Sequence, residues 1–179
     1  MPSNKDRLYV ALHARSGAPK MPGKEDIYHW ALLIAPKTER KSSVCLHYEA
    51  KERPKTEGTW EWFFAESTRS VGPTDMLLVR IMVAKIIDKT DLVGVLRETP
   101  VRQDTPGWNC VGWVKEALER VQANGQMVGR QMLEWEAIRN EAMRYCQMKR
   151  DQHRFDGKGS FDIQTVPTFD LIEGREIVV

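Results

Sequence analysis

The chain has 179 residues, of which 41% are hydrophobic and 29% are charged. This length suits one domain with a sizeable core, and the composition is too apolar for a disordered protein. Lys and Arg total 27 against 25 Asp and Glu. So even a balance argues against nucleic acid as a partner, because nucleic-acid-binding proteins concentrate positive charge on one surface. We expect a single domain over residues 1–179.

The apolar runs are too short to cross a membrane. The longest, residues 76–87, is interrupted by Arg80 and Lys85 and falls well short of the roughly 20 residues that a spanning helix needs. The first residues lack the pattern of a signal peptide. Three cysteines without paired spacing do not make a disulfide framework. We therefore expect a cytoplasmic protein in a reducing compartment, with no membrane span.

The first half of the chain predicts strands. A β-prone run at 8–15 ends in a loop rich in Pro and Gly. Two further runs, 27–35 and 44–50, flank a polar loop and are typical of an antiparallel hairpin. The run 59–64 has the aromatic content that strands favour. The nearly continuous apolar run 76–86 favours a central strand covered on both faces.

The second half changes to helical periodicity. A short helix is predicted over 91–97, with Asp91 as its N-cap, and a clearer one over 109–121, followed by a stop at Gly125. The longest helix is predicted over about 130–150, and the tail ends in a β-prone segment at 177–179. Strands followed by helices favour the α+β class, with a small antiparallel sheet of four to five strands.

Cys110 is the residue with the clearest chemical potential. It stands at the predicted start of the second helix, with Asn109 as the expected N-cap. The unpaired N–H groups and the positive end of the helix dipole favour a thiolate there, and the same N–H groups can receive an oxyanion. The alternative is that Cys110 packs as a small hydrophobe on the apolar side of its helix.

A thiol nucleophile needs a base, and the base needs an orienting group. His29, between two aromatic residues on a predicted strand, is the best candidate for the base. His47 and Glu49 share one face of the next strand, and either residue could orient the His29 ring. If the hairpin turns about residues 37–39, His47 comes level with His29, so we favour His47.

These motifs resemble a known group of enzymes. A His-Trp strand (His29), a second histidine on the next strand (His47) and Asn-Cys at the start of a later helix (Cys110) resemble the permuted papain-like thiol enzymes. These are the NlpC-like and lecithin–retinol acyltransferase-type proteins. The same motifs are similar to those of a group of small fungal proteins with His-Trp and Trp-Asn-Cys sequences. The resemblance implies a circularly permuted papain-like fold, with a Cys-bearing helix packed across the sheet and a long C-terminal helix.

The resemblance also implies a function. Cys110 would be the nucleophile, His29 the base and His47 the orienting partner of a hydrolase or acyltransferase that acts on an amide, ester or thioester. The substrate would be a small-molecule or peptide acyl compound. Asn109, Trp108 and Trp113 flank the thiol, and the two tryptophans would wall the cleft. We expect neither a cofactor nor a metal, because metal-ligand spacing is absent. The alternatives are an inactive interaction module with the same fold and a tailoring enzyme of small-molecule biosynthesis.

Overall fold

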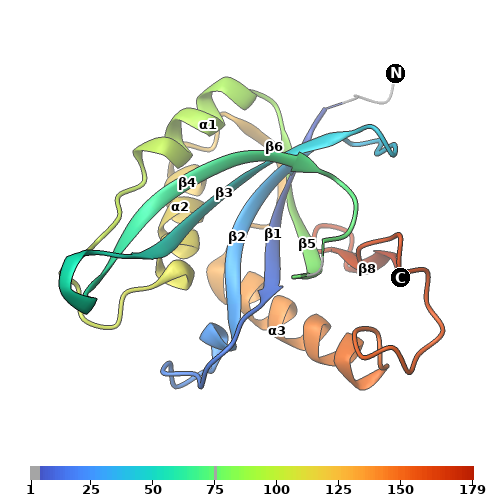
Figure 1. The fold of residues 1–179 in the computed structure, drawn as a ribbon. Helices are drawn as coiled ribbons and strands as arrows, with labels where there is room; N and C mark the ends of the chain where they lie inside the picture. The colour runs from blue at the N-terminus through green and yellow to red at the C-terminus, as the bar shows by residue number, and fades with distance from the viewer. Residues whose placement is uncertain (1–4, 75) are drawn as a thin grey trace.

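The computed structural model of the chain describes residues 5–74 and 76–179. In this part of the chain, eight strands form one mixed sheet that curves around helices on one side (Figure 1). The main path of the sheet runs in the order β4-β3-β2-β1-β5-β7-β8, and β6 pairs with β5 beside β7. The strands are β1 (Arg7–Ala14), β2 (Tyr28–Ala35), β3 (Val44–Pro54), β4 (Trp60–Ser70), β5 (Leu77–Ile86), β6 (Val128–Gln131), β7 (Thr168–Asp170) and β8 (Arg175–Val178).

The expectation of a small antiparallel sheet of four to five strands in a papain-like fold is wrong. The five long strands lie near the predicted positions, but the described sheet has eight strands and is mixed, because β7 pairs with β5 in parallel. The strands that the sequence did not indicate, or indicated only at its last residues, are β6, β7 and β8, with four, three and four residues. Segments this short carry too little alternation to reveal a strand, and β6 lies where the long helix was expected to begin.

Three α-helices follow the long strands in the described part of the chain. They are α1 (Lys89–Glu98), α2 (Cys110–Asn124) and α3 (Trp135–Asp151), and two 3-10 turns at Glu25–Ile27 and Thr56–Gly58 precede β2 and β4. In Figure 1, α2 and α3 lie behind the sheet; α2 packs on β2 and β3, and α3 packs on β1 and β5. The predicted stop of the second helix is confirmed, since Gly125 ends α2 in the left-handed conformation.

The N-cap of α1 differs from the prediction. Asp88, and not Asp91, begins this helix, and its side chain accepts a hydrogen bond from the Asp91 N–H. Three residues separate the two aspartates, so both lie in the first turn. Asp88 stands one residue before the helix, where a carboxylate can accept a hydrogen bond from an N–H group that has no acceptor within the helix. Asp88 is therefore the N-cap, and the Asp91 N–H is the donor.

The two faces of the sheet carry different sets of side chains. Successive residues of a strand point to opposite faces, and directly paired residues share a face. Even-numbered residues of β1 and β2, such as Leu12 and Trp30, pack with α2 and α3 in the main core. Odd-numbered residues, such as Tyr9 and Leu33, form a smaller cluster on the other face with Cys45. His13 and His29 are directly paired, so both lie on this second face.

Strands β2 and β3 separate after a short contact. Their register covers three pairs, Leu32↔Tyr48, Leu33↔His47 and Ile34↔Leu46. Beyond these pairs β2 continues along β1, while β3 continues along β4 as far as Pro54 (Figure 1). The divergence opens the sheet where β2 begins, and it lets a residue from the helix side reach a side chain on the other face.

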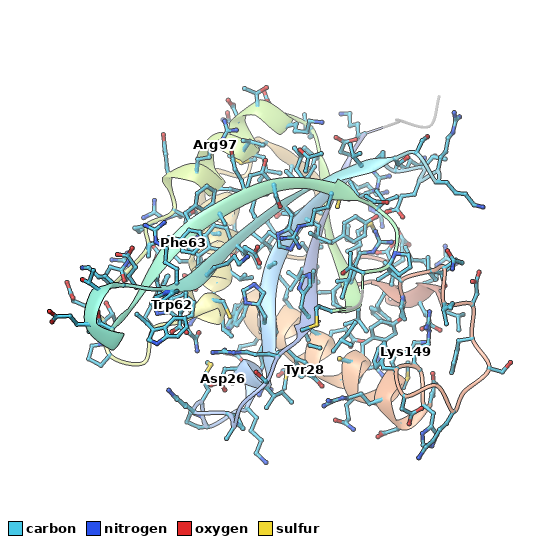
Figure 2. The ribbon with its side chains drawn as sticks, in the orientation of Figure 1. Asp26, Tyr28, Trp62, Phe63, Arg97 and Lys149 are labelled. Atoms are coloured by element: carbon cyan, nitrogen blue, oxygen red, sulfur yellow. The ribbon has the colours of Figure 1, made fainter. Side chains whose placement is uncertain are left out.

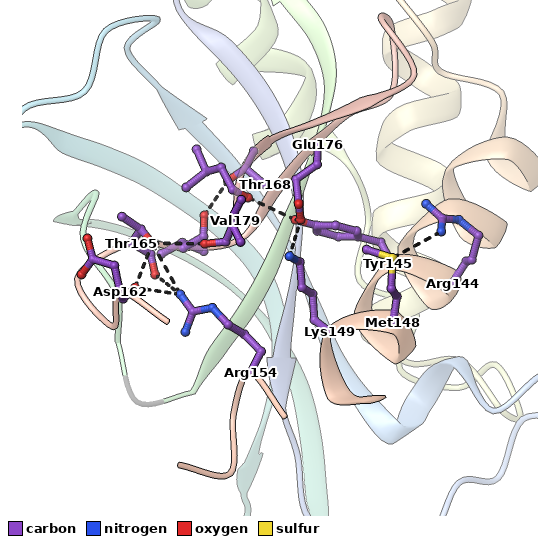
Figure 3. Close-up of polar contacts among 12 residues, drawn as sticks. Arg144, Tyr145, Met148, Lys149, Arg154, Asp162, Thr165, Thr168, Glu176 and Val179 are labelled. Carbon is purple, nitrogen blue, oxygen red and sulfur yellow. Dashed lines mark hydrogen bonds and ion pairs between the residues drawn. The ribbon is translucent and has the colours of Figure 1, made fainter. Parts of the chain in front are cut away.

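The C-terminal strand is attached to α3 by buried polar contacts (Figure 3). The Tyr145 hydroxyl donates a hydrogen bond to the Glu176 carboxylate at 2.5 Å, and the Lys149 ammonium forms an ion pair with the same carboxylate. Lys149 is 1% exposed. Burial and the Glu176 contact raise the pKa of the Tyr145 hydroxyl. These contacts attach β8 to α3. Strand β8 is the edge of the sheet opposite β4.

None of the helices in the described residues is both long and apolar enough to cross a bilayer. The prediction that a signal peptide is absent concerns the first residues, and residues 1–4 lie outside the described part of the chain.

Candidate active site

Cys110 is the first residue of α2, and Asn109 is its N-cap, as predicted. The Asn109 side-chain oxygen accepts hydrogen bonds from the N–H groups of Val111 at 3.0 Å and Gly112 at 3.3 Å. These bonds satisfy two of the orphan donors and fix the first turn of the helix. The N–H of Cys110 precedes them and has no intrahelical acceptor, so it remains a donor at the position of the thiol.

The His29 ring stands between a carboxylate and the thiol. Its Nε2 atom lies 2.6 Å from Oε2 of Glu49. The side chain of Cys110 is close enough to the same ring to raise its pKa. Because Nε2 faces Glu49, Nδ1 is the nitrogen that remains for Cys110. Glu49 is almost buried, with a side-chain exposure of 5%, and His29 is 22% exposed. An acid, an imidazole and a thiol therefore follow one another in a chain of contacts.

The electrostatics of these contacts favour a charged imidazole. Burial alone would lower the pKa of His29, but the hydrogen bonds and charges of Cys110 and Glu49 raise it to about 9. Burial would likewise raise the pKa of Glu49, but the hydrogen bond with His29 and the surrounding positive charges lower it to about 2. At neutral pH the pair therefore consists of an imidazolium and a carboxylate.

His47 lies near the site but does not contact His29. The predicted register, with His47 level with His29, is wrong, because His47 pairs with Leu33 on β2. The turn of this hairpin is closed by a bond from the Ser43 N–H to the Arg40 carbonyl, beyond the tip assumed from the sequence. The nearest charged contact of His47 is 3.5 Å, from Nδ1 to the Glu49 carboxylate. The structure thus brings Glu49, the alternative, to the His29 ring.

A third histidine completes the cluster on this face. The ring of His13 lies 5.8 Å from that of His29 and 5.2 Å from that of His47, measured between centroids. Burial, with the neighbouring histidines, lowers the pKa of His13 to about 3. Burial also lowers the pKa of His47 to about 4. Both rings are therefore neutral at neutral pH, and only His29 carries a proton charge.

Arg69 and Lys51 also contact Glu49, and the sequence indicated neither of them. For Arg69 the contact is a hydrogen bond. Its Nη2 donates to Oε1 of Glu49 at 3.1 Å, opposite the oxygen that faces His29. Arg69 lies on β4, and it is too far along the chain from the motif residues for a local sequence pattern to link it to Glu49. Although histidines and a carboxylate gather here, no group of three or more His, Cys, Asp or Glu side chains in residues 5–74 and 76–179 is arranged to hold a metal ion.

The two tryptophans beside Cys110 have different positions. Trp113 is fully buried, donates from Nε1 to the Thr99 carbonyl and packs on Phe64, so the expectation that it walls a cleft is wrong. It lies three residues after Cys110 and faces the core. Trp108 is half-buried and meets Trp62 edge to face, with ring centroids 5.4 Å apart. The close fit of Trp108 over Gly112 fixes the entry to α2, since a Cβ on Gly112 would lie 3.2 Å from the indole.

An open pocket of about 360 Å³ lies beside His29. His29, Glu49 and Trp62 line it, and Trp62 lies on the lower part of the β3–β4 hairpin in Figure 2. Cys110 itself is 0% exposed and is not among the residues that line this pocket. The other two cysteines, Cys45 and Cys146, are also free and buried. The base therefore faces the pocket, while the thiol is buried.

Comparisons with known proteins give one match. Residues 5–178 match the model of a family whose description is a family of unknown function (DUF6914). No curated protein and no solved structure matches the chain.

Proposed function

This chain belongs to the DUF6914 family of unknown function, and we propose that it is a cysteine-dependent hydrolase or acyltransferase acting on an amide, ester or thioester. The observation that carries the proposal is the contact chain from Glu49 through His29 to Cys110. A nucleophile, a base within its reach and a third group that holds the base are the parts that thiol catalysis requires.

The chemistry follows from the protonation states. With the pKa of His29 at about 9, the imidazolium form prevails at neutral pH and would stabilise a thiolate on Cys110 as the sulfur reacts. The sulfur attacks the carbonyl carbon, and the Cys110 N–H donates to the oxyanion. When the bond to the leaving group breaks, His29 gives it the proton. Water, or an acceptor amine, then loses a proton to His29 and attacks the thioester, which releases the product and restores the thiol.

The complete burial of Cys110 favours a second candidate, an interaction module that has no catalytic activity. In this candidate the thiol is a core residue, and His29 and Glu49 form a structural ion pair. The two candidates differ in one measurable property, the accessibility and ionisation of Cys110.

The test is labelling by iodoacetamide as a function of pH, with the site assigned by mass spectrometry. Cys45 and Cys146 serve as internal controls, because burial raises the pKa of both thiols, that of Cys146 to about 11. We expect Cys110 to react at lower pH than either, and His29→Ala to remove the difference. The ultraviolet absorbance of the thiolate reports the same ionisation without requiring access.

A second measurement tests the covalent step. 4-Nitrophenyl acetate should leave an acetyl group on Cys110 in the wild type and none on this helix in Cys110→Ala. Cys146→Ala is the matched control, because it removes a buried thiol elsewhere. Equally slow labelling of all three cysteines, with no acetylation of Cys110, would exclude the enzyme and favour the interaction module.

A further inference from the structure

The pocket beside His29 carries an excess of cationic side chains. Arg15, Lys51 and Arg69 line it, against the carboxylates of Glu49 and Glu52. Arg15 directly follows β1, Lys51 lies on β3 and Arg69 lies on β4, so three separate segments bring positive charge to one opening. Charges of one sign in a concave site raise the local concentration of ligands of the opposite sign.

The carboxylate of Glu49 is engaged with Arg69 and His29, which leaves Arg15 and Lys51 as the cations available to a ligand. One of its oxygens faces His29 and the other accepts from Arg69. Lys51 lies 3.8 Å from Glu49, which is longer than a hydrogen bond, and its side chain is 46% exposed. Its ammonium is therefore available to a ligand, and Glu52 is the one remaining carboxylate among the residues described as lining the pocket.

Part of the lining is apolar. Trp62 and Met76 contribute to the wall. Trp62 contacts Trp108, which stands two residues before Cys110. A ligand with a charged end near Lys51 and an apolar chain against Trp62 would thus extend in the direction of the start of α2. An acyl compound with a terminal carboxylate has both the charged end and the apolar chain.

We propose that this pocket binds the carboxylate of an anionic acyl substrate, with Lys51 and Arg15 as its recognition residues. The inference rests on the proposed function in taking the ligand to be the acyl group that Cys110 receives. Arg69 holds Glu49 and also borders the pocket, so it is not used as a test residue. The acyl chain lies along Trp62. Because Cys110 is buried and does not line the pocket, its acylation requires the His29 side chain to move aside.

A binding measurement tests the inference without catalysis. Monoethyl glutarate has one free carboxylate, and diethyl glutarate has none. Binding of each to the Cys110→Ala protein is followed by the shift of the Trp62 indole resonance in NMR. We expect the monoanion to bind about tenfold more tightly at low salt, as one charge-assisted contact provides. The advantage should shrink as salt is added, because the two cations lie at an open surface.

Substitutions assign the effect to the two cations. Lys51→Gln and Arg15→Gln should each reduce the preference for the monoanion by about threefold, the usual scale of a partly exposed ion pair. Lys158→Gln removes the same charge from an exposed position outside the pocket and should leave the preference unchanged. Equal binding of the two esters, or a preference that neither Lys51→Gln nor Arg15→Gln reduces, would overturn the inference.

Activated esters separate this inference from the proposed function. The wild type is assayed with 4-nitrophenyl hemiglutarate and with the neutral 4-nitrophenyl pentanoate. Hydrolysis of both at equal rates would overturn the anionic preference and leave the thiol enzyme intact. Selective binding of monoethyl glutarate, with no turnover of either ester, would leave the anion pocket intact and overturn the enzyme.

Discussion

The Nε2 atom of His29 lies 2.6 Å from Oε2 of Glu49, although the two residues are 20 positions apart and are not paired in the sheet. Glu49 reaches the ring diagonally, from the point where β3 separates from β2. Cys110 comes from the start of α2, which packs on β2 and β3, and its side chain influences the same ring.

Glu49→Gln should lower the pKa of His29 toward its ordinary value, because the substitution removes the carboxylate that stabilises the imidazolium. The ring would also lose its fixed orientation, so acylation of Cys110 should slow by about 10²-fold, within the range of general acid–base effects. NMR titration of His29 and the rate of acetylation measure the two consequences.

Glu61→Gln is the control for this prediction. Glu61 pairs with Arg53 on the exposed β3–β4 hairpin, so the variant makes the same chemical change on a neighbouring strand. Neither the His29 titration nor the acetylation rate should change. A wild-type pKa of His29 in Glu49→Gln would show that the carboxylate does not control the ring.

Acid should destabilise the protein through His13 and His47. Their folded-state pKa values, about 3 and about 4, lie below the ordinary value of 6.5, so the unfolded chain binds more protons between these limits. The contribution of these two histidines to the free energy of unfolding is therefore fully present above pH 6.5 and falls on acidification, by about 1 kcal/mol per pH unit for each histidine. His29 adds no slope here, because its raised pKa keeps it protonated in both states well below 6.5.

Urea unfolding of the wild type and of His47→Gln between pH 4.5 and 6.5 measures this slope. At pH 6.5 the free energy of unfolding of His47→Gln should be equal to or lower than that of the wild type. As the pH is lowered, it should fall less steeply than that of the wild type. His153→Gln, on the exposed surface, is the control and should keep the wild-type slope. Parallel slopes for His47→Gln and the wild type would mean that the buried ring titrates normally.

Asn109→Ala should cost about 1 kcal/mol of stability, the usual effect of losing an N-cap. It should also slow alkylation of Cys110, because the first turn that positions the thiol is no longer fixed by the bonds to Val111 and Gly112. Asp88→Ala removes the cap of α1 and is the matched control. It should cost a similar amount in thermal unfolding but leave the alkylation rate as it was. An equal effect of both variants on Cys110 would contradict a local role for Asn109.

Glu176→Gln should destabilise the protein by about 2 kcal/mol, because it leaves the ammonium of Lys149 buried without a countercharge. The amide can still accept a bond from Tyr145, so the change isolates the charge. Glu173→Gln breaks an exposed pair with Arg130 and should cost less than about 1 kcal/mol. Denaturant unfolding measures both, and similar losses would show that the Lys149 charge is solvated.

Features that depend on neighbouring residues could be predicted from the sequence. The long strands β1 and β2 have continuous β-prone runs, and Asn109 before an amphipathic segment indicates where α2 begins, because capping is a contact over two or three residues. These local signals were sufficient to single out Cys110 and His29 as the two residues that the fold brings together.

The groups that contact the His29 ring depend on tertiary contacts and could not be read from the sequence. The register of β2 and β3 depends on the closure of a long loop and on which apolar residues share a face, and neither is encoded in the alternation of one strand. A change of register moves His47 away from the ring and brings Glu49 to it. The short strands β6, β7 and β8 likewise form because long neighbours offer them hydrogen bonds and buried area, which no segment of three or four residues specifies alone.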